Sequence, residues 1–181
     1  MARPELSAAS HVVLGMLATY GPATPYDLKR WVDASVGYFW SVPRAQLYVE
    51  PERLARLGLV EETREESGRR RRTYRITEAG RQALAGWLRA PGDDAVELRD
   101  PGLLKLFFAG ALDTSELVVL ARRQQASHAR RLAAYEELQA SLASDARQAF
   151  ARATLQLGRL HEQLAVEFWR GVAADPPHRP D

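Results

Sequence analysis

The stretch that decides the fold is YDLKRWVDASVGYFWSVPRAQLYVEPERLARLGLVEETREESGRRRRTYRIT, residues 26–77. Two helix-like segments come first, and two strand-like segments then flank a polar turn centred on Ser67-Gly68. The turn ends in four consecutive arginines: Arg69, Arg70, Arg71 and Arg72. Four adjacent guanidinium groups repel one another and gain nothing from a hydrophobic core, so the run needs water or phosphate around it. The stretch therefore points to a polyanion.

Three helices are expected ahead of the strands. Each begins at a residue whose side chain can accept a hydrogen bond from the free N–H groups of the first turn. The second and third also carry an early proline, whose missing N–H costs nothing at a helix start. The predicted starts are Ser7 or Ser10 for the helix that ends at Tyr20, Thr24 with Pro25 for the second helix, and Ser41 with Pro43 for the third, which ends at Gly58.

The strands and a fourth helix complete the pattern. Residues 59–63 and 73–77 are predicted strands, and Thr77 caps a helix that reaches Leu88. Helix, helix, helix, strand, turn, strand, helix is the order of a winged helix-turn-helix domain. Within the third helix, Pro51 is expected to kink or restart the chain, and its neighbours Glu50 and Glu52 to bring acidic groups near phosphate.

The C-terminal half is helical in pattern. Capping chemistry at 113–116 opens a long helix with a coiled-coil-like seam and a polar middle. The seam consists of Leu117, Ala121, Gln124, His128, Arg131, Tyr135, Leu138 and Leu142. The last helix presents one apolar face, made of Phe150, Ala153, Leu157, Leu160, Leu164 and Phe168. A break at Ser144-Asp145 separates the two helices and makes them antiparallel neighbours.

The predicted fold class is mainly α, with two domains. A winged helix-turn-helix domain occupies residues 1–90, and a Pro-Gly linker with two aspartates occupies 91–100. An antiparallel, coiled-coil-like helical domain follows at 101–174, and 175–181 is expected to be a disordered tail.

Composition excludes several classes of protein. The chain has no cysteine, so it has neither disulfides nor thiolate metal sites. It has no signal-peptide pattern and no run near the roughly 20 apolar residues of a membrane span, so a soluble, cytoplasmic protein is expected. Residues 1–90 hold 14 Arg/Lys against 10 Asp/Glu, and residues 91–181 hold 11 against 13. The basic excess lies in the half that carries the arginine run.

Nothing in the chain favours an enzyme. It has no phosphate-cradling glycine loop, serine elbow or cysteine nucleophile, and no cofactor is implied. His11, His128 and His161 lie too far apart, without ligand spacing, to indicate a metal, and the segment His161-Glu162 is expected at the surface or an interface. The large aromatic residues are expected in the core rather than at a ligand: Trp31, Phe39, Trp40 and Trp87.

Taken together, these segments resemble the PadR family of transcriptional regulators. The resemblance rests on Pro25-Tyr26-Asp27-Leu28, Tyr38-Phe39-Trp40, Gln46-Leu47-Tyr48, LARLGLVE at 54–61 and RRRTYRITEAG at 70–80. It is strong over about residues 10–90. Over 100–172 it holds only in pattern, where the chain is similar to the long helical dimerisation region of the larger PadR subgroup.

The resemblance implies a homodimer whose recognition helices enter successive major grooves of a near-palindromic operator in double-stranded DNA. It places Tyr26, Lys29, Ser41, Arg44, Gln46, Tyr48 and the wing residues Arg69, Arg70, Arg71 and Arg72 at the DNA. Many members carry a small hydroxyl residue where this chain has Gln46. Glutamine can read adenine through two hydrogen bonds, so a distinct site preference is expected.

The resemblance further implies a repressor that a small aromatic effector relieves, with the effector between the winged and helical domains. The candidate residues of the effector site are Phe107, Phe108, Tyr135 and Trp169. The alternative for each is that it serves only in packing. The expected dimer contacts are Leu117, Tyr135, Leu138, Leu157, Leu160, Leu164 and Phe168. The alternative function is a protein-interaction module that uses the C-terminal helices and has no specific DNA target.

Overall fold

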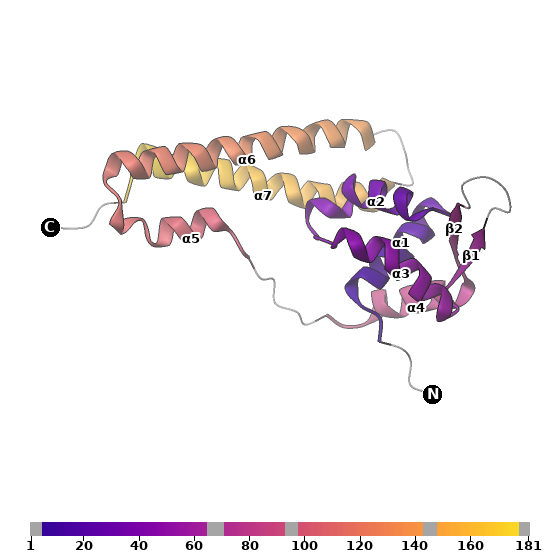
Figure 1. The fold of residues 1–181 in the computed structure, drawn as a ribbon. Coiled ribbons are helices and arrows are strands. Elements are labelled where there is room, and N and C mark those ends of the chain that lie inside the picture. Colours follow the sequence, from indigo (N-terminus) through magenta and orange to yellow (C-terminus); the bar gives the residue numbers. More distant parts are fainter. Residues whose placement is uncertain (1–4, 65–70, 93–97, 143–147, 178–181) are drawn as a thin grey trace. The chain divides into compact units, whose positions relative to one another are not determined.

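The computed structural model describes residues 5–64, 71–92, 98–142 and 148–177, which form two compact units, Met1–Asp94 and Ala95–Asp181. Figure 1 shows the helices and strands of both units. Some predicted features lie outside the described residues: the Ser67-Gly68 turn with Arg69 and Arg70, the middle of the 91–100 linker, the break at Ser144-Asp145 and the end of the tail.

The first unit has the predicted order of elements, which confirms the winged helix-turn-helix. Its elements are α1 (Ala8–Tyr20), α2 (Pro25–Asp33), the 3₁₀ helix η1 (Val36–Tyr38), α3 (Arg44–Arg56), β1 (Val60–Arg64), β2 (Arg72–Ile76) and α4 (Glu78–Arg89). The two strands are antiparallel, with Val60 opposite Ile76. On its other side, β2 exchanges two backbone hydrogen bonds with Ala23, at 2.8 and 2.9 Å to Tyr74. The wing is thereby joined to the segment between α1 and α2.

Capping chemistry sets most of the helix starts in this unit. The side chains of Ser7, Thr24 and Thr77 each accept a hydrogen bond from the N–H three residues later. The predicted cap of α3 was wrong. Pro43 is the N-cap residue and Arg44 the first helical residue, so Ser41 lies too far upstream for its hydroxyl to reach the free N–H groups.

Of the kink or restart predicted at Pro51, the restart does not occur, because α3 continues through this residue to Arg56. A proline at this position removes one backbone hydrogen bond. Its ring is fully buried, however, and the apolar contacts that it gains oppose that loss.

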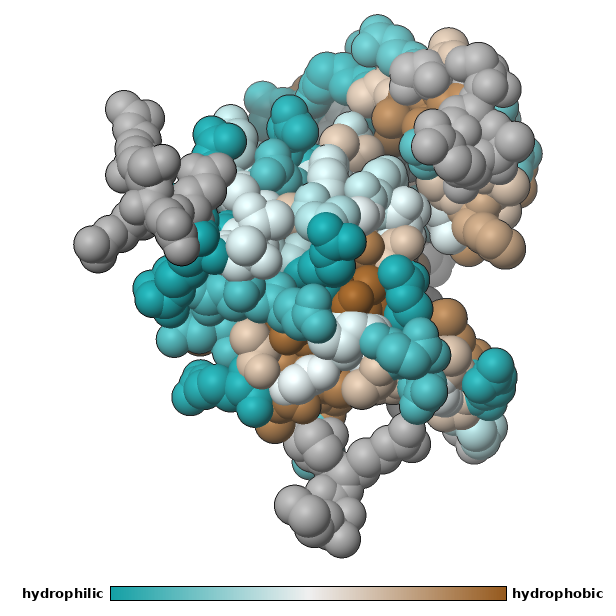
Figure 2. Space-filling view, turned by 90° about the vertical axis from the view of Figure 1, so that its right-hand side faces the viewer, coloured by the Kyte–Doolittle hydropathy of each residue, from teal (hydrophilic) through white to brown (hydrophobic). Residues whose placement is uncertain are grey.

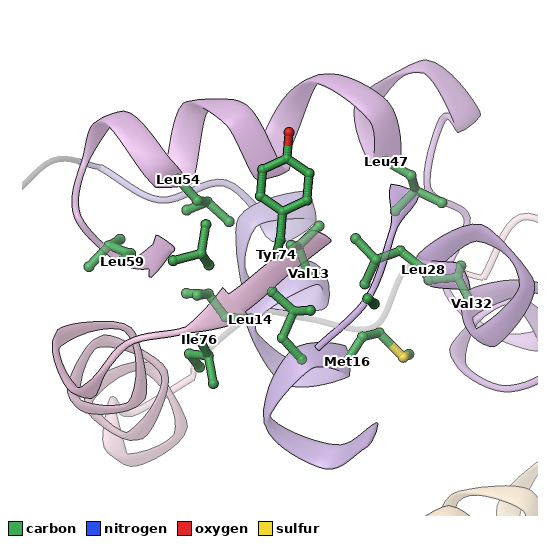
Figure 3. Packing of buried hydrophobic residues seen from close by; sticks show 13 residues of the cluster. Val13, Leu14, Met16, Leu28, Val32, Leu47, Leu54, Leu59, Tyr74 and Ile76 are labelled. Atoms are coloured by element: carbon green, nitrogen blue, oxygen red, sulfur yellow. The ribbon is translucent and has the colours of Figure 1, made fainter. Parts of the chain in front are cut away.

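One apolar cluster holds the first unit together (Figure 3). Its fully buried members from the helices are Val13, Leu14, Leu17, Leu28, Leu47 and Leu54. Tyr74 contributes the largest buried side chain of the wing, and it extends from β2 toward α3 with its hydroxyl away from the centre of the cluster. The recognition helix and the wing therefore share one core.

The aromatic residues expected in the core lie mostly at the surface. Trp31 is half-buried, with its ring centroid 5.0 Å from that of Tyr20. Phe39, Trp40 and Trp87 are exposed, because the first two belong to the loop before α3 and the third to the outer face of α4. Trp87 stacks instead on the imidazole of His11, with the centroids 4.5 Å apart, and burial lowers the pKa of that histidine.

The second unit is a long helical hairpin preceded by a short helix. Its elements are α5 (Pro101–Phe107), the 3₁₀ helix η2 (Ala109–Ala111), α6 (Thr114–Leu142) and α7 (Ala149–Ala174). α6 and α7 lie side by side (Figure 1) and run antiparallel, since His128 pairs with Glu162 while Glu136, farther along α6, pairs with the earlier Arg159. None of the described helices is long and apolar enough to cross a membrane.

The predicted seam of α6 packs within the chain, against a face of α7 that the sequence did not indicate. On α6 the buried seam residues are Leu117, Ala121, His128 and Tyr135. On α7 the buried residues are Leu155, Glu162 and Trp169, spaced by seven. The apolar face predicted for α7 faces solvent instead, with Phe150, Leu157, Leu160, Leu164 and Phe168 exposed.

Candidate nucleic-acid interface

The recognition helix α3 has one buried and one exposed side. Leu47 and Leu54 point into the core, at a spacing of seven residues, or about two helical turns. Arg44, Gln46 and Tyr48 are exposed at the start of the helix. Ser41 is exposed as well, in the loop that leads into α3. The structure therefore brings these four predicted DNA contacts to the surface within one short stretch.

A second group of predicted contacts lies on α2. Tyr26 and Lys29 border a depression of about 370 Å³ that also includes Arg30, Asp33 and Tyr38. The ammonium of Lys29 lies 2.5 Å from a carboxylate oxygen of Asp33. This hydrogen bond, and then the charges of Lys29 and Arg44, lower the pKa of Asp33. Asp33 thus pairs with one cation of α2 and also senses the charge of Arg44 on α3.

The wing presents a third group. Arg71 and Arg72 are exposed at the start of β2. The charge of Arg71 is among the influences that lower the pKa of Asp27, after the hydrogen bond from Thr24 and others. Arg72 lies 3.4 Å from Glu52 and 3.6 Å from Glu62, so it contacts carboxylates of α3 and β1. Figure 2 faces the side on which β1 and β2 lie in Figure 1, where hydrophilic residues lie among neutral and hydrophobic ones.

Sequence reasoning missed the role of Glu50, which it expected near phosphate. Its side chain is buried and accepts hydrogen bonds from the Ser10 hydroxyl at 2.5 Å and from Arg53 Nη1 at 2.7 Å. Arg53 also donates to the backbone carbonyl of Glu5 at 3.0 Å. Glu50 therefore ties α3 to α1 on the side away from the exposed residues. Its spacing of three from Leu47 and four from Leu54 was the available signal, since both are core positions.

The four candidate effector residues do not form one site. Phe107 and Phe108 are exposed next to each other, with edge-to-face rings 5.0 Å apart, whereas Tyr135 and Trp169 are buried in the hairpin. The ring of Tyr135 packs on Gly158. Trp169 lies eleven residues farther along α7, about 16 Å at the helical rise, so one small molecule cannot touch both rings.

Phe108 lines an open groove of about 650 Å³ in the second unit. Leu104, Leu112 and Val119 give it apolar lining, and its charged lining residues are two cations and one carboxylate: Lys105, Arg123 and Glu116. Its residues come from α5, η2 and the start of α6. Among the described residues, no group of three His, Asp or Glu side chains could hold a metal ion.

The residues expected at a dimer interface divide into two sets. Leu117 and Tyr135 are buried and Leu138 half-buried, so these residues of α6 already pack within one chain. Leu157, Leu160, Leu164 and Phe168 are exposed. Together with Phe150 they form the α7 stripe, an apolar face that α6 does not cover.

Comparison with known families adds two matches. Residues 13–86 match the transcriptional regulator PadR-like family, and residues 98–174 match the C-terminal region of virulence activator alpha. Among characterised proteins, the chain is 27% identical over 137 residues to the negative transcriptional regulator PadR of Bacillus subtilis, over 72% of this chain and 75% of that protein.

Solved structures show the same fold. The structure of Bacillus subtilis PadR with operator DNA has a TM-score of 0.83 at 23% identity and covers 93% of this chain and 98% of that chain. The same protein with p-coumaric acid has a TM-score of 0.78 at 22% identity and covers 96% of this chain and 97% of that chain. The Vibrio cholerae virulence activator AphA has a TM-score of 0.71 at 28% identity and covers 93% of this chain and 97% of that chain.

Proposed function

Because the chain belongs to the PadR-like family of transcriptional regulators, we propose that it is a homodimeric repressor of a near-palindromic operator in double-stranded DNA, relieved by a small aromatic effector. Its Bacillus subtilis relative is a negative regulator that has been solved with operator DNA. A repressor acts where the chromosome lies, so this function carries the expectation of a cytoplasmic protein.

The observation that carries the proposal is the two-sided recognition helix. Leu47 and Leu54 fix one side of α3 in the core, and Arg44, Gln46 and Tyr48 stand on the surface at its N-terminal end. The N-terminal residues of a recognition helix are those that reach base edges in the major groove. Gln46 is the candidate for base reading, because its amide can pair with adenine through two hydrogen bonds.

The phosphate contacts would come from both sides of α3. Tyr26 and Lys29 on α2, and Arg71 in the wing, supply a hydroxyl and two cations around the helix. Such contacts set the position and the affinity of the protein without reading the sequence. Arg69 and Arg70 belong to the same run and are proposed as phosphate contacts with them.

The α7 stripe supports the homodimer. Large apolar side chains recur along about five turns of one helix face and remain in contact with water in a single chain. A second copy would cover the stripe with an identical one, as a two-fold interface requires. Two winged domains joined in this way could bind both half-sites of an operator.

The groove beside Phe108 supports the effector. An aromatic acid would find apolar lining there and two cations, Lys105 and Arg123, for its carboxylate. The relative solved with p-coumaric acid belongs to this chemical class. The effector can relieve repression only by the difference between its affinities for the DNA-bound and released states.

The test is binding of the purified protein to a duplex of its own promoter region and to a random duplex of equal length, at several salt concentrations. We expect a preference for the promoter and an affinity that falls steeply as salt rises. Gln46→Ala should change the preference among sequences, while Gln82→Ala, on the exposed face of α4, should not. Absence of any preference at moderate salt would reject the repressor and favour the protein-interaction module.

A further inference from the structure

We propose that Arg72 is a positioning residue that ties the wing to the recognition helix, whereas its neighbour Arg71 contacts phosphate. This inference rests on the proposed function, because it concerns how the same DNA-binding surface is held. Arg71 and Arg72 thereby have different roles, although in the sequence they are adjacent members of one arginine run.

Three elements meet at the Arg72 guanidinium. Its Nη1 lies 3.4 Å from Oε2 of Glu52 on α3, and its Nε lies 3.6 Å from Oε1 of Glu62 on β1. Arg64 also donates to Oε1 of Glu62, at 2.5 Å, which holds that carboxylate in place. The planar guanidinium presents five N–H donors in a fixed fork, so it can bridge several acceptors in one geometry.

A third neighbour of the guanidinium comes from the core. The Tyr74 hydroxyl is the largest influence that raises the pKa of Arg72, ahead of the charge of Glu62. Tyr74 is buried and its backbone pairs with Ala23, so its ring has a fixed position. Arg72 is therefore anchored to a rigid side chain on β2 while it reaches Glu52 on α3.

Phosphate binding by Arg72 would require it to leave two carboxylates. Glu52 and Glu62 would then face the DNA without that cation, at a cost to binding. Arg71 lies immediately before β2 and is exposed, and its charge is among the influences on the Asp27 carboxyl of α2. The two arginines thus face different carboxylates, and Arg72 is left to fix the wing against α3.

The test compares Arg72→Ala with Arg71→Ala in the full-length protein, on the promoter duplex and the random duplex. Arg71→Ala should weaken binding to both duplexes equally and reduce the slope of log affinity against log salt by about 0.9. Arg72→Ala should leave that slope unchanged and lower the ratio of promoter to random affinity by about tenfold, the effect of one lost base contact. Glu52→Gln should lower the ratio in the same direction.

Amide hydrogen exchange of the free protein provides a readout that does not depend on DNA. Arg72→Ala should speed exchange across β1 and β2, and Arg71→Ala should not. The proposal would be overturned if Arg72→Ala exchanged its amide hydrogens at the wild-type rate. It would also be overturned if Arg72→Ala reduced the salt slope as much as Arg71→Ala does. If the wild type showed no preference for its promoter, the proposed function would fail, and the exchange measurement would still decide whether Arg72 holds the wing.

Discussion

His128 on α6 and Glu162 on α7 form a 2.6 Å hydrogen bond between two side chains that are almost fully buried. Arg131 approaches the same pair, with its Nε 3.4 Å from Oε2 of Glu162. The pair occupies the polar middle of a seam that is otherwise mostly apolar. The imidazole and the carboxylate can form their hydrogen bond at only one alignment of the two helices. The pair is therefore expected to specify the register of the hairpin.

Removal of either partner alone should destabilise the second unit. His128→Leu leaves a buried carboxylate, and Glu162→Leu leaves a buried imidazole, without the partner that it has now. The expected cost is about 3–5 kcal/mol in the free energy of unfolding. The double variant, with both groups replaced by leucine, should lie within about 1 kcal/mol of the wild type or above it. Chemical denaturation at a fixed protein concentration measures all three, and single variants as stable as the wild type would contradict this role.

The α6–α7 hairpin shows how far the sequence predicts this fold. The spacing of Leu117 and Tyr135 identified the buried face of α6. The same reasoning did not find the face of α7 that packs on α6, because the stripe through Leu157 and Leu164, expected at the dimer interface, is the more apolar one. The face that packs on α6 contains Gly158 and Glu162, and these residues have no apolar signal. The packing of a ring on Gly158 and the pairing of Glu162 with His128 can be recognised only when the partner helix is known.

The winged unit was more predictable because its signals are local. Thr24 and Thr77 cap the helices that they were expected to cap, and the two predicted strands pair with each other. Errors arose where a distant residue decides the outcome. One of the two donors that satisfy the buried Glu50 is Ser10, forty residues earlier in the chain. The grouping of Arg72 with Arg71 likewise could not be questioned before Glu52 was seen beside it.

Charge on the α7 stripe should separate the dimer. Leu164→Glu places a carboxylate in the middle of the proposed interface, where burying it without a partner is costly. We expect monomers at micromolar concentration by analytical ultracentrifugation, an unchanged helical signal, and promoter affinity reduced by at least tenfold, because the two half-sites are no longer bound together. Leu88→Glu on α4 is the matched control, since Leu88 is 68% exposed and Leu164 70%. A Leu164→Glu protein that stays dimeric would place the interface elsewhere.

A side chain at Gly80 should destabilise the winged unit. A Cβ there would lie 2.1 Å from the carbonyl oxygen of Leu59 and 2.8 Å from a side-chain carbon of Ile76. The backbone would have to move at the junction of β2 and α4, and we expect a loss of about 3 kcal/mol or more. Gly15→Ala is the control, because its Cβ would meet nothing within 4 Å and alanine favours a helix interior by roughly 0.5–1 kcal/mol. Thermal unfolding should therefore shift in opposite directions for the two variants.

The cap of α2 should contribute to the free energy of unfolding, and this contribution should depend on pH. The Thr24 hydroxyl donates to Oδ2 of Asp27 at 2.7 Å and accepts from the Asp27 N–H at 3.2 Å. The bond to the carboxylate is the largest cause of the lowered pKa of Asp27. A carboxyl whose pKa is lower in the folded state contributes stability above its unfolded pKa, and loses it as the pH falls through the folded pKa.

Thr24→Ala should therefore cost about 1 kcal/mol near neutral pH, and less as the pH falls below the ordinary aspartate value of 3.8. Urea unfolding of both proteins between about pH 2 and pH 7 measures the difference. Thr24→Ser keeps the hydroxyl and should follow the wild-type curve within a few tenths of a kcal/mol. A difference between wild type and Thr24→Ala that is constant over the whole range would show that the Asp27 carboxylate contributes nothing through this bond. The cap would then act only through the hydrogen bond that the hydroxyl accepts from the backbone.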